Sequence, residues 1–187
     1  MENYSTRHVD KNAVLEDATQ AKYGDHSLIL YSELANFEYL YLNYIKRSLE
    51  LLNEIVLILP HHHPVTDIIN NLRNTGIDID KYKKEGSIVV VQSKKAYYNL
   101  SQEFVGVMIM TKMLLGRACK LGKAGVTVIS DIIQGYAPYS FACTCIIRVA
   151  KDDVIKNKNK AADRLVTSGY AMLYYGSTSL NRHLLSM

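Results

Sequence analysis

The sequence is poor in the residues that build covalent frameworks. Its 187 residues include no tryptophan, three prolines and three cysteines, Cys119, Cys143 and Cys145. Three cysteines are too few for the paired framework of a small secreted domain, so we expect a reducing environment. No apolar run approaches the ~20 residues of a membrane span, and the chain does not open with a charged and then apolar signal segment. We therefore predict a cytoplasmic protein that does not bind a membrane.

A phosphate-binding loop is also missing. The turn residues Gly24, Asp25 and His26 precede the apolar run Ser27–Tyr31, where a nucleotide-binding α/β domain would place its first strand. Such a domain continues with glycines that cradle phosphate, then a lysine and a serine or threonine. Residues 32–38, SELANFE, contain neither glycine nor lysine. This absence favours sensing over catalysis, so we predict a protein that is not an enzyme and has no cofactor.

The composition that remains is that of an ordinary globular protein. Hydrophobic residues make up 48% of the chain and charged residues 21%, with a net charge of +4. This is enough for one domain with a sizeable core. Basic runs at 81–84 and 156–160 are typical of solvated loops or helix ends, so we predict no direct contact with nucleic acid.

From residue 27 onward, short apolar runs alternate with longer amphipathic stretches. This alternation predicts an α/β fold in three layers, with a mostly parallel sheet and helices on both of its faces. The predicted strands are 27–31, 54–59, 87–92 and 126–130, and the helices between them begin near Ser32, Pro64 and Ser101, the last two ending at Gly76 and Gly122.

The two ends of the chain are harder to interpret. Residues 1–22 are polar and predict an arm or capping segment, in which 12–20 could form a short helix. The domain itself is expected to span 23–175. Its last third predicts a helix over 139–149 and a strand over 169–175, and 176–187 form a C-terminal tail.

The ordered motifs of residues 22–140 resemble the MEDS domain, a sensory domain of methanogens and methylotrophs that also occurs in DcmR. The matching segments are YGDHSLILYSE at the start, EIVLIL, TGID after the second helix, Ala96-Tyr97 and GVTVISD ending at Asp131. The resemblance implies a RecA/KaiC-like core that lacks its phosphate loop and senses small organic molecules or relays signals. MEDS domains often adjoin a DNA-binding or kinase module, and no helix-turn-helix is evident here.

A ligand site is predicted where parallel strands end. Ligands of open α/β sheets bind outside the carboxyl ends of the strands. If the strands follow the RecA-like order that the resemblance implies, the first and fourth are neighbours, and Tyr31, Ser32 and Asp131 converge on one crevice. Asp131 would then accept a hydrogen bond from a ligand or from Ser32. The alternative is that it caps a turn.

Histidines suggest two further features. The Gly24-Asp25-His26 motif is expected to be structural, with the aspartate carboxylate held against backbone N–H groups; a pH- or ligand-responsive His26 is the alternative. His61, His62 and His63 follow the second strand, so His61 is a candidate ligand-binding residue. Because adjacent loop residues point in different directions, this run would need a further ligand, such as Asp67, to hold a metal.

The remaining residue patterns indicate packing rather than catalysis or ligand binding. On the predicted helix over 139–149, Cys143 and Cys145 point away from each other and serve as small core residues. Most of the fourteen tyrosines are expected to pack at the edge of the core. No pattern of a nucleophile, a histidine and a carboxylate indicates hydrolysis.

These observations favour a non-enzymatic sensory domain that binds a small organic ligand or a signalling or transcription-regulator partner. Three alternatives stay open: a residual nucleotide-binding protein, a metal-responsive protein that uses the 61–63 loop, and a scaffold that forms a homodimer.

Overall fold

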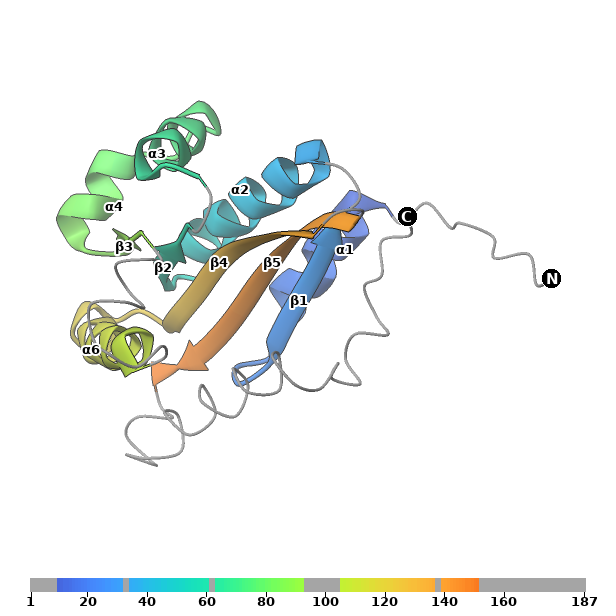
Figure 1. Cartoon of the computed structure of the whole chain (residues 1–187). Helices are drawn as coiled ribbons and strands as arrows, with labels where there is room; N and C mark the ends of the chain where they lie inside the picture. Colours follow the sequence, from blue (N-terminus) through green and yellow to red (C-terminus); the bar gives the residue numbers. More distant parts are fainter. Residues whose placement is uncertain (1–9, 32–33, 61–62, 93–104, 137–138, 152–187) are drawn as a thin grey trace.

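The computed structural model describes residues 10–31, 34–60, 63–92, 105–136 and 139–151. Five helices and five strands occupy these residues (Figure 1). In chain order they are α1 (Lys11–Gln20), β1 (His26–Tyr31), α2 (Leu34–Glu50), β2 (Ile55–Leu59), α3 (Val65–Asn74), α4 (Ile79–Glu85), β3 (Ile88–Val90), α6 (Val105–Leu121), β4 (Gly125–Tyr136) and β5 (Tyr139–Ala150).

One five-stranded sheet organises the fold, in the order β1-β5-β4-β2-β3. Strand β2 pairs in parallel with both β3 and β4, whereas β5 is antiparallel to β4 and to β1. It follows that β1, β2, β3 and β4 point the same way and β5 runs against them. The predicted α/β class with a mostly parallel sheet is confirmed.

The expected adjacency of the first and fourth strands is wrong, because β5 lies between them. The helix predicted over 139–149 is also wrong, because these residues form β5. Its β-branched residues, including Thr144, Ile146 and Val149, suit a strand, and pairing along β4 satisfies its backbone. Small residues such as Ala142 and Cys143 obscured that preference. The argument that a helix separates Cys143 from Cys145 therefore does not apply.

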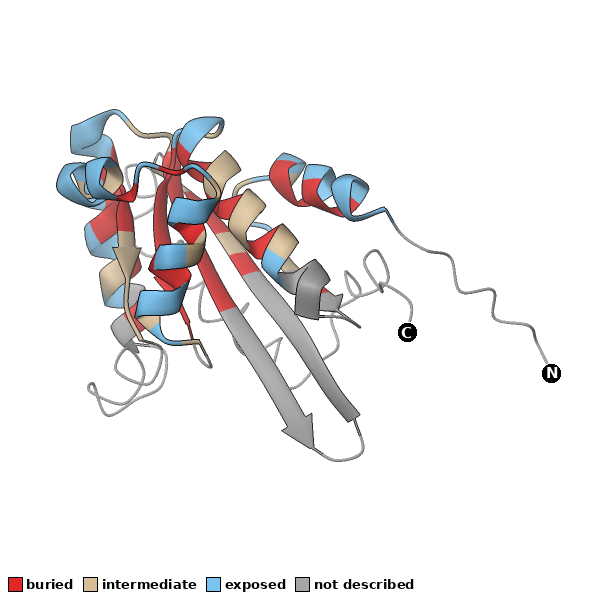
Figure 2. Ribbon diagram, turned by 90° about the horizontal axis from the view of Figure 1, so that it is seen from above, coloured by how far each residue is buried: buried red, intermediate tan, exposed pale blue. Residues whose placement is uncertain are grey.

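The helices cover both faces of the sheet, and β2 shows why. Its Val56 and Ile58 pack in a cluster with residues of α1, α2, α3 and α4, whereas Ile55, Leu57 and Leu59 pack in a second cluster with α6. Alternate residues of a strand point to opposite faces, so a strand buried on both sides is apolar throughout. In Figure 2 the described residues of the central strands are mostly buried, whereas the helices around them carry exposed residues on their outer sides.

Most of the predicted helices are present. Helix α3 is followed by Gly76, and α6 by Gly122, with φ angles of 82° and 65° respectively. Both glycines thus take the left-handed conformation that commonly ends a helix, as predicted. The predicted strand over 169–175 and the tail lie outside the described residues.

Helix α1 is part of the core rather than an arm. The predicted short helix is present, capped by the Asp10 carboxylate, which accepts a hydrogen bond from the Asn12 backbone N–H at 2.9 Å. Its Val14, Leu15 and Ala18 are buried against α2 and the sheet. The polar composition of residues 1–22 concealed this narrow apolar stripe, which is enough to fix a helix of three turns.

Candidate functional site

The most densely connected polar group in the described structure is a buried cluster around Glu54 and Arg148. The Glu54 side chain is completely inaccessible to solvent and that of Arg148 nearly so. The guanidinium donates from Nη2 to Glu54 Oε1 at 2.7 Å and from Nε to the same oxygen at 3.0 Å. Thr127 Oγ1 donates to Glu54 Oε2 at 2.5 Å. Both carboxylate oxygens are therefore satisfied, and the two charges neutralise each other.

Strand register brings these three residues together. Thr127 of β4 pairs directly with Arg148 of β5, and Ile55, which follows Glu54, pairs with Val126 on the other side of β4. The cluster thus lies at the amino ends of the parallel strands β2 and β4. This is the edge opposite the one where open α/β sheets bind ligands.

Arg148 also holds the segment that leads from α1 into β1. Its Nη1 donates to the backbone carbonyl of Thr19 at 3.2 Å and to that of Ala21. The Tyr23 ring lies over the guanidinium, 4.6 Å from Cζ, in cation–π geometry. The Gly24 backbone N–H donates to the Arg148 carbonyl at 2.8 Å. One side chain therefore joins α1, β2 and β5.

Two tyrosines beside this cluster have altered acidity. Burial, and next the negative charge of Glu54, raise the pKa of Tyr44 and that of Tyr23 to about 12. Burial lowers the pKa of Arg148, but the nearby Glu54 carboxylate outweighs this and raises it overall. All of these shifts favour neutral tyrosines and a charged arginine.

Two hydroxyl groups next to the cluster are buried without a hydrogen bond. They are Tyr44 Oη and Ser48 Oγ, one turn apart on α2. Ser48 and Thr127 are near enough to Tyr44 to lower its pKa slightly, but no hydrogen bond of acceptable geometry joins them. Each hydroxyl therefore adds the cost of removing a polar group from water.

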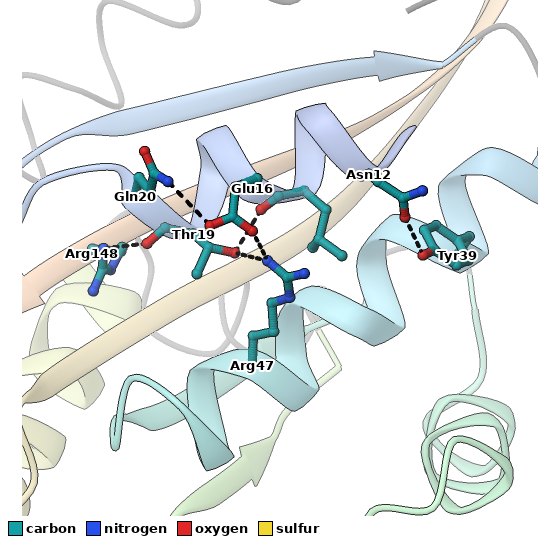
Figure 3. A network of polar contacts seen from close by, with 8 residues as sticks. Asn12, Glu16, Thr19, Gln20, Tyr39, Arg47 and Arg148 are labelled. Carbon is teal, nitrogen blue, oxygen red and sulfur yellow. Dashed lines mark hydrogen bonds and ion pairs between the residues drawn. The ribbon is translucent and has the colours of Figure 1, made fainter. Parts of the chain in front are cut away.

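Polar contacts also fasten α1 to α2 (Figure 3). Arg47 Nη1 lies 2.6 Å from Glu16 Oε2, and Tyr39 Oη donates to Asn12 Oδ1 at 2.7 Å. These groups are half-buried or exposed, so each contact contributes little to stability. They hold α1 against α2 next to the contact between Arg148 and the Thr19 carbonyl.

The structure places the residues of the predicted Gly-Asp-His motif around Arg148. Asp25 Oδ2 accepts a hydrogen bond from the Lys22 backbone N–H at 2.9 Å, so the predicted use of this carboxylate is confirmed. Gly24 has a φ of 90°, which explains why a glycine serves at this turn. The backbone of His26 pairs with Ile147 of β5.

The predicted ligand-binding residues are less close than expected. Tyr31 ends β1 and pairs with Ala142, whereas Asp131 lies within β4 and pairs with Thr144. Strand β5 separates them, and Tyr31 lies two residues farther along β1 than the partner of Thr144, which places their backbones roughly 12 Å apart. Strand β4 does not end at Asp131 but continues to Tyr136. The strand was expected to end there because Asp131 follows an apolar run, yet pairing with β5 carries it onward.

Two further candidates, Ser32 and His61, lie outside the described residues, as does His62 of the histidine run. Within the ranges that the structure describes, no group of three histidine, cysteine or acidic side chains could hold a metal ion. No helix in those ranges is long and apolar enough to cross a membrane.

Sequence reasoning missed Glu54, Arg148, Thr127 and Tyr23. A signal for the first two was available: Glu54 opens an otherwise apolar strand, and Arg148 interrupts the apolar run of residues 145–150. A single charge in a buried strand requires an opposite charge nearby. The cluster that they form is closed, neutral and satisfied, so it suits structural support rather than acid–base chemistry.

Comparison with known proteins gave no identification. No family model, no curated protein and no solved structure matches this chain.

Proposed function

We propose that the chain is a non-catalytic sensory domain, similar to MEDS domains, that binds a small organic ligand or a signalling partner on a degenerate RecA/KaiC-like scaffold. The proposal includes a cytoplasmic location and a homodimer as its working form. The observation that carries it is the junction between β1 and α2. Strand β1 ends at Tyr31 and α2 begins at Leu34, so two residues lie between them. A phosphate loop needs several glycine-rich residues there, together with a lysine.

The proposed ligand edge is where the parallel strands end. Leu59, the last residue of β2, pairs with Ser130 of β4. The next residue of β4 is Asp131, which therefore lies beside the end of β2 although β4 continues to Tyr136. In the sequence, His61 follows the last residue of β2 by two positions. Tyr31 ends β1 on the far side of β5, and Ser32 is the next residue in the sequence. A ligand that contacts both groups must therefore span β5, which favours an organic molecule over a single ion.

Native mass spectrometry of protein purified from its own host tests this proposal. We expect a bound organic molecule whose occupancy falls about tenfold in Asp131→Asn, since a carboxylate that accepts a ligand hydrogen bond contributes about this much. The same spectra report whether the protein is a dimer. A matched variant at an exposed aspartate of α1, Asp17→Asn, should retain the molecule.

Calorimetry with ATP and magnesium provides the opposing test. We expect no heat of binding. Saturable ATP binding would contradict the proposal and support a nucleotide-binding protein. A rise in melting temperature with stoichiometric Zn²⁺ or Ni²⁺ that His62→Ala abolishes would instead support the metal-responsive alternative.

A further inference from the structure

The outward surface of α6 is unusually apolar. Large exposed hydrophobic side chains in the described part of the chain number four, and three of them are on this helix: Ile109, Met113 and Leu121. Ile109 is 47% exposed and Met113 70%. The opposite side of α6, with Val107, Leu114, Leu115 and Ala118, packs against the sheet. Helix α6 therefore presents apolar side chains in two directions, and the described residues of the core pack against one of them.

Gly116 continues the exposed stripe. Residues three and four apart share one surface of a helix, so Ile109, Met113, Gly116 and Lys120 form a row. We call this row, with its neighbours Lys112 and Arg117, the α6 outer face. A Cβ atom added to Gly116 would meet nothing within 4 Å, so packing against the described residues does not require a glycine. Glycine inside a helix costs stability relative to alanine, but it allows another backbone to approach closely.

The charge of this helix selects the kind of partner. The α6 outer face includes three exposed cations, Lys112, Arg117 and Lys120, and the helix contains no acidic residue. A second copy of α6 would bring like charges together. Residues 152–187 of the chain are no better matched, because they carry five lysines and arginines against three aspartates. Acidic side chains would complement the cations at both margins of the row.

We propose that the α6 outer face docks an amphipathic helix of a partner protein, with apolar residues along its centre and acidic residues on its flanks. Such helices bind through apolar side chains at helical spacing. A membrane fits less well, since membrane-binding helices carry several bulky residues such as Trp, Phe and Leu on their apolar face, whereas the row on α6 contains two large apolar residues, Ile109 and Met113. The purpose of the contact rests on the proposed signalling function, but the contact itself does not.

A designed peptide tests the proposal on the full chain. The probe is a fluorescently labelled helix of roughly three heptads, with leucine at the core positions and glutamate at the flanking ones. A second peptide carries lysine in place of each glutamate. We expect saturable binding of the acidic peptide, weakened by salt, and at least about tenfold weaker binding of the basic one.

Variants of the protein locate the contact. Met113→Glu and Gly116→Leu should each weaken binding of the acidic peptide by about tenfold or more, through repulsion and by blocking close approach. Both positions are open to solvent, so melting temperatures should stay within a few degrees of the parent. The matched control is Leu51→Glu, because Leu51 is as exposed as Met113 at 68% but follows α2. It should bind the peptide as the parent does.

Three results would overturn the proposal. They are equal binding by all three variants, sedimentation with anionic vesicles that Met113→Glu abolishes, and a dimer that Met113→Glu dissociates. The last two would assign the face to a membrane or to a second copy. The peptide assay requires no small ligand, so a failure of peptide binding does not bear on the proposed ligand edge. Conversely, loss of the organic ligand in Asp131→Asn does not alter the expected peptide binding.

Discussion

Among single residues, Arg148 links three of the described elements, α1, β2 and β5. Its guanidinium reaches the carboxylate just before β2, the backbone carbonyls of Thr19 in α1 and Ala21 after it, and the ring of Tyr23. Taking both charges of such a pair out of water is costly, so the pair adds little to stability by itself. Removing one partner is different, because the other charge then stays buried alone.

Glu54→Gln should therefore destabilise the fold strongly. We expect the free energy of unfolding to fall by about 3 kcal/mol, since Arg148 keeps its charge without compensation. Replacing both residues by methionine should recover much of this loss. Urea denaturation of the single and double variants, beside a control variant, measures the change in the free energy of unfolding. The control is Asp80→Asn in the exposed pair with Arg73, where we expect a change below about 1 kcal/mol. Equal changes for Glu54→Gln and Asp80→Asn would contradict the structural role of the cluster.

The sequence allowed part of this site to be predicted. The turn role of Asp25 follows from local chemistry, because an aspartate beside a glycine can bond its own backbone. Glu54 and Arg148 are separated by 94 residues, and their pairing depends on β5 lying beside β4. With residues 139–149 interpreted as a helix, no reasoning from spacing could bring them together.

Among the elements, those with a strong apolar pattern were predictable and those that depend on distant partners were not. Strand β2 is apolar at every position and α3 has a distinct buried side, so both stand out in the sequence. Helix α4 was not predicted: it is a single short helix with one buried residue, Ile79. Strand β5 depends on pairing with β4 and β1, which local sequence does not encode.

Helix α1 offers a test of what belongs to the core. Leu15→Ala should lower the free energy of unfolding by about 2–4 kcal/mol, because Leu15 is buried between α1 and the rest of the domain. Leu51→Ala, at an exposed position, should change it by less than about 0.5 kcal/mol. Thermal unfolding followed by circular dichroism compares the two. A loss for Leu15→Ala as small as that for Leu51→Ala would mean that α1 is a dispensable arm.

For the whole molecule, the two edges of the sheet have different properties. The amino ends of β2 and β4 carry the neutral ion pair and the buried hydroxyls, which fix the strands to α1 and α2. Of the predicted ligand residues that the structure describes, Tyr31 ends β1, whereas Asp131 lies within β4, just beyond the position that pairs with the end of β2. The mostly parallel sheet was predictable from the alternation of strands and helices, but its order was not, because an antiparallel strand inserted beside β1 leaves no trace in that alternation.

Alkaline pH should weaken the fold through Tyr44. Its pKa is about 12 in the folded protein, against about 10 in an unfolded chain. Its contribution is fully present below pH 10 and is lost as the pH rises toward 12, because the unfolded chain releases its proton first. The loss is at most about 3 kcal/mol. In Tyr44→Phe this decline should be shallower, and stability at pH 7 should stay the same or rise, since the buried hydroxyl has no hydrogen bond to lose.

Urea unfolding of both proteins at several pH values between 8 and about 11.5 provides the comparison. Parallel curves for the parent and Tyr44→Phe would show that this tyrosine does not govern the alkaline decline.

The link between Arg148 and the Thr19 carbonyl joins residues 129 positions apart, and within the described sheet β1 pairs with β5 alone. During synthesis on the ribosome, at about 5–20 residues per second, α1 and β1 would wait on the order of ten seconds for those partners to emerge. The nascent chain would meanwhile expose an unpaired strand edge and the apolar side of a short helix. We therefore expect the segment from α1 to β1 to be open to aggregation until β5 has been synthesised.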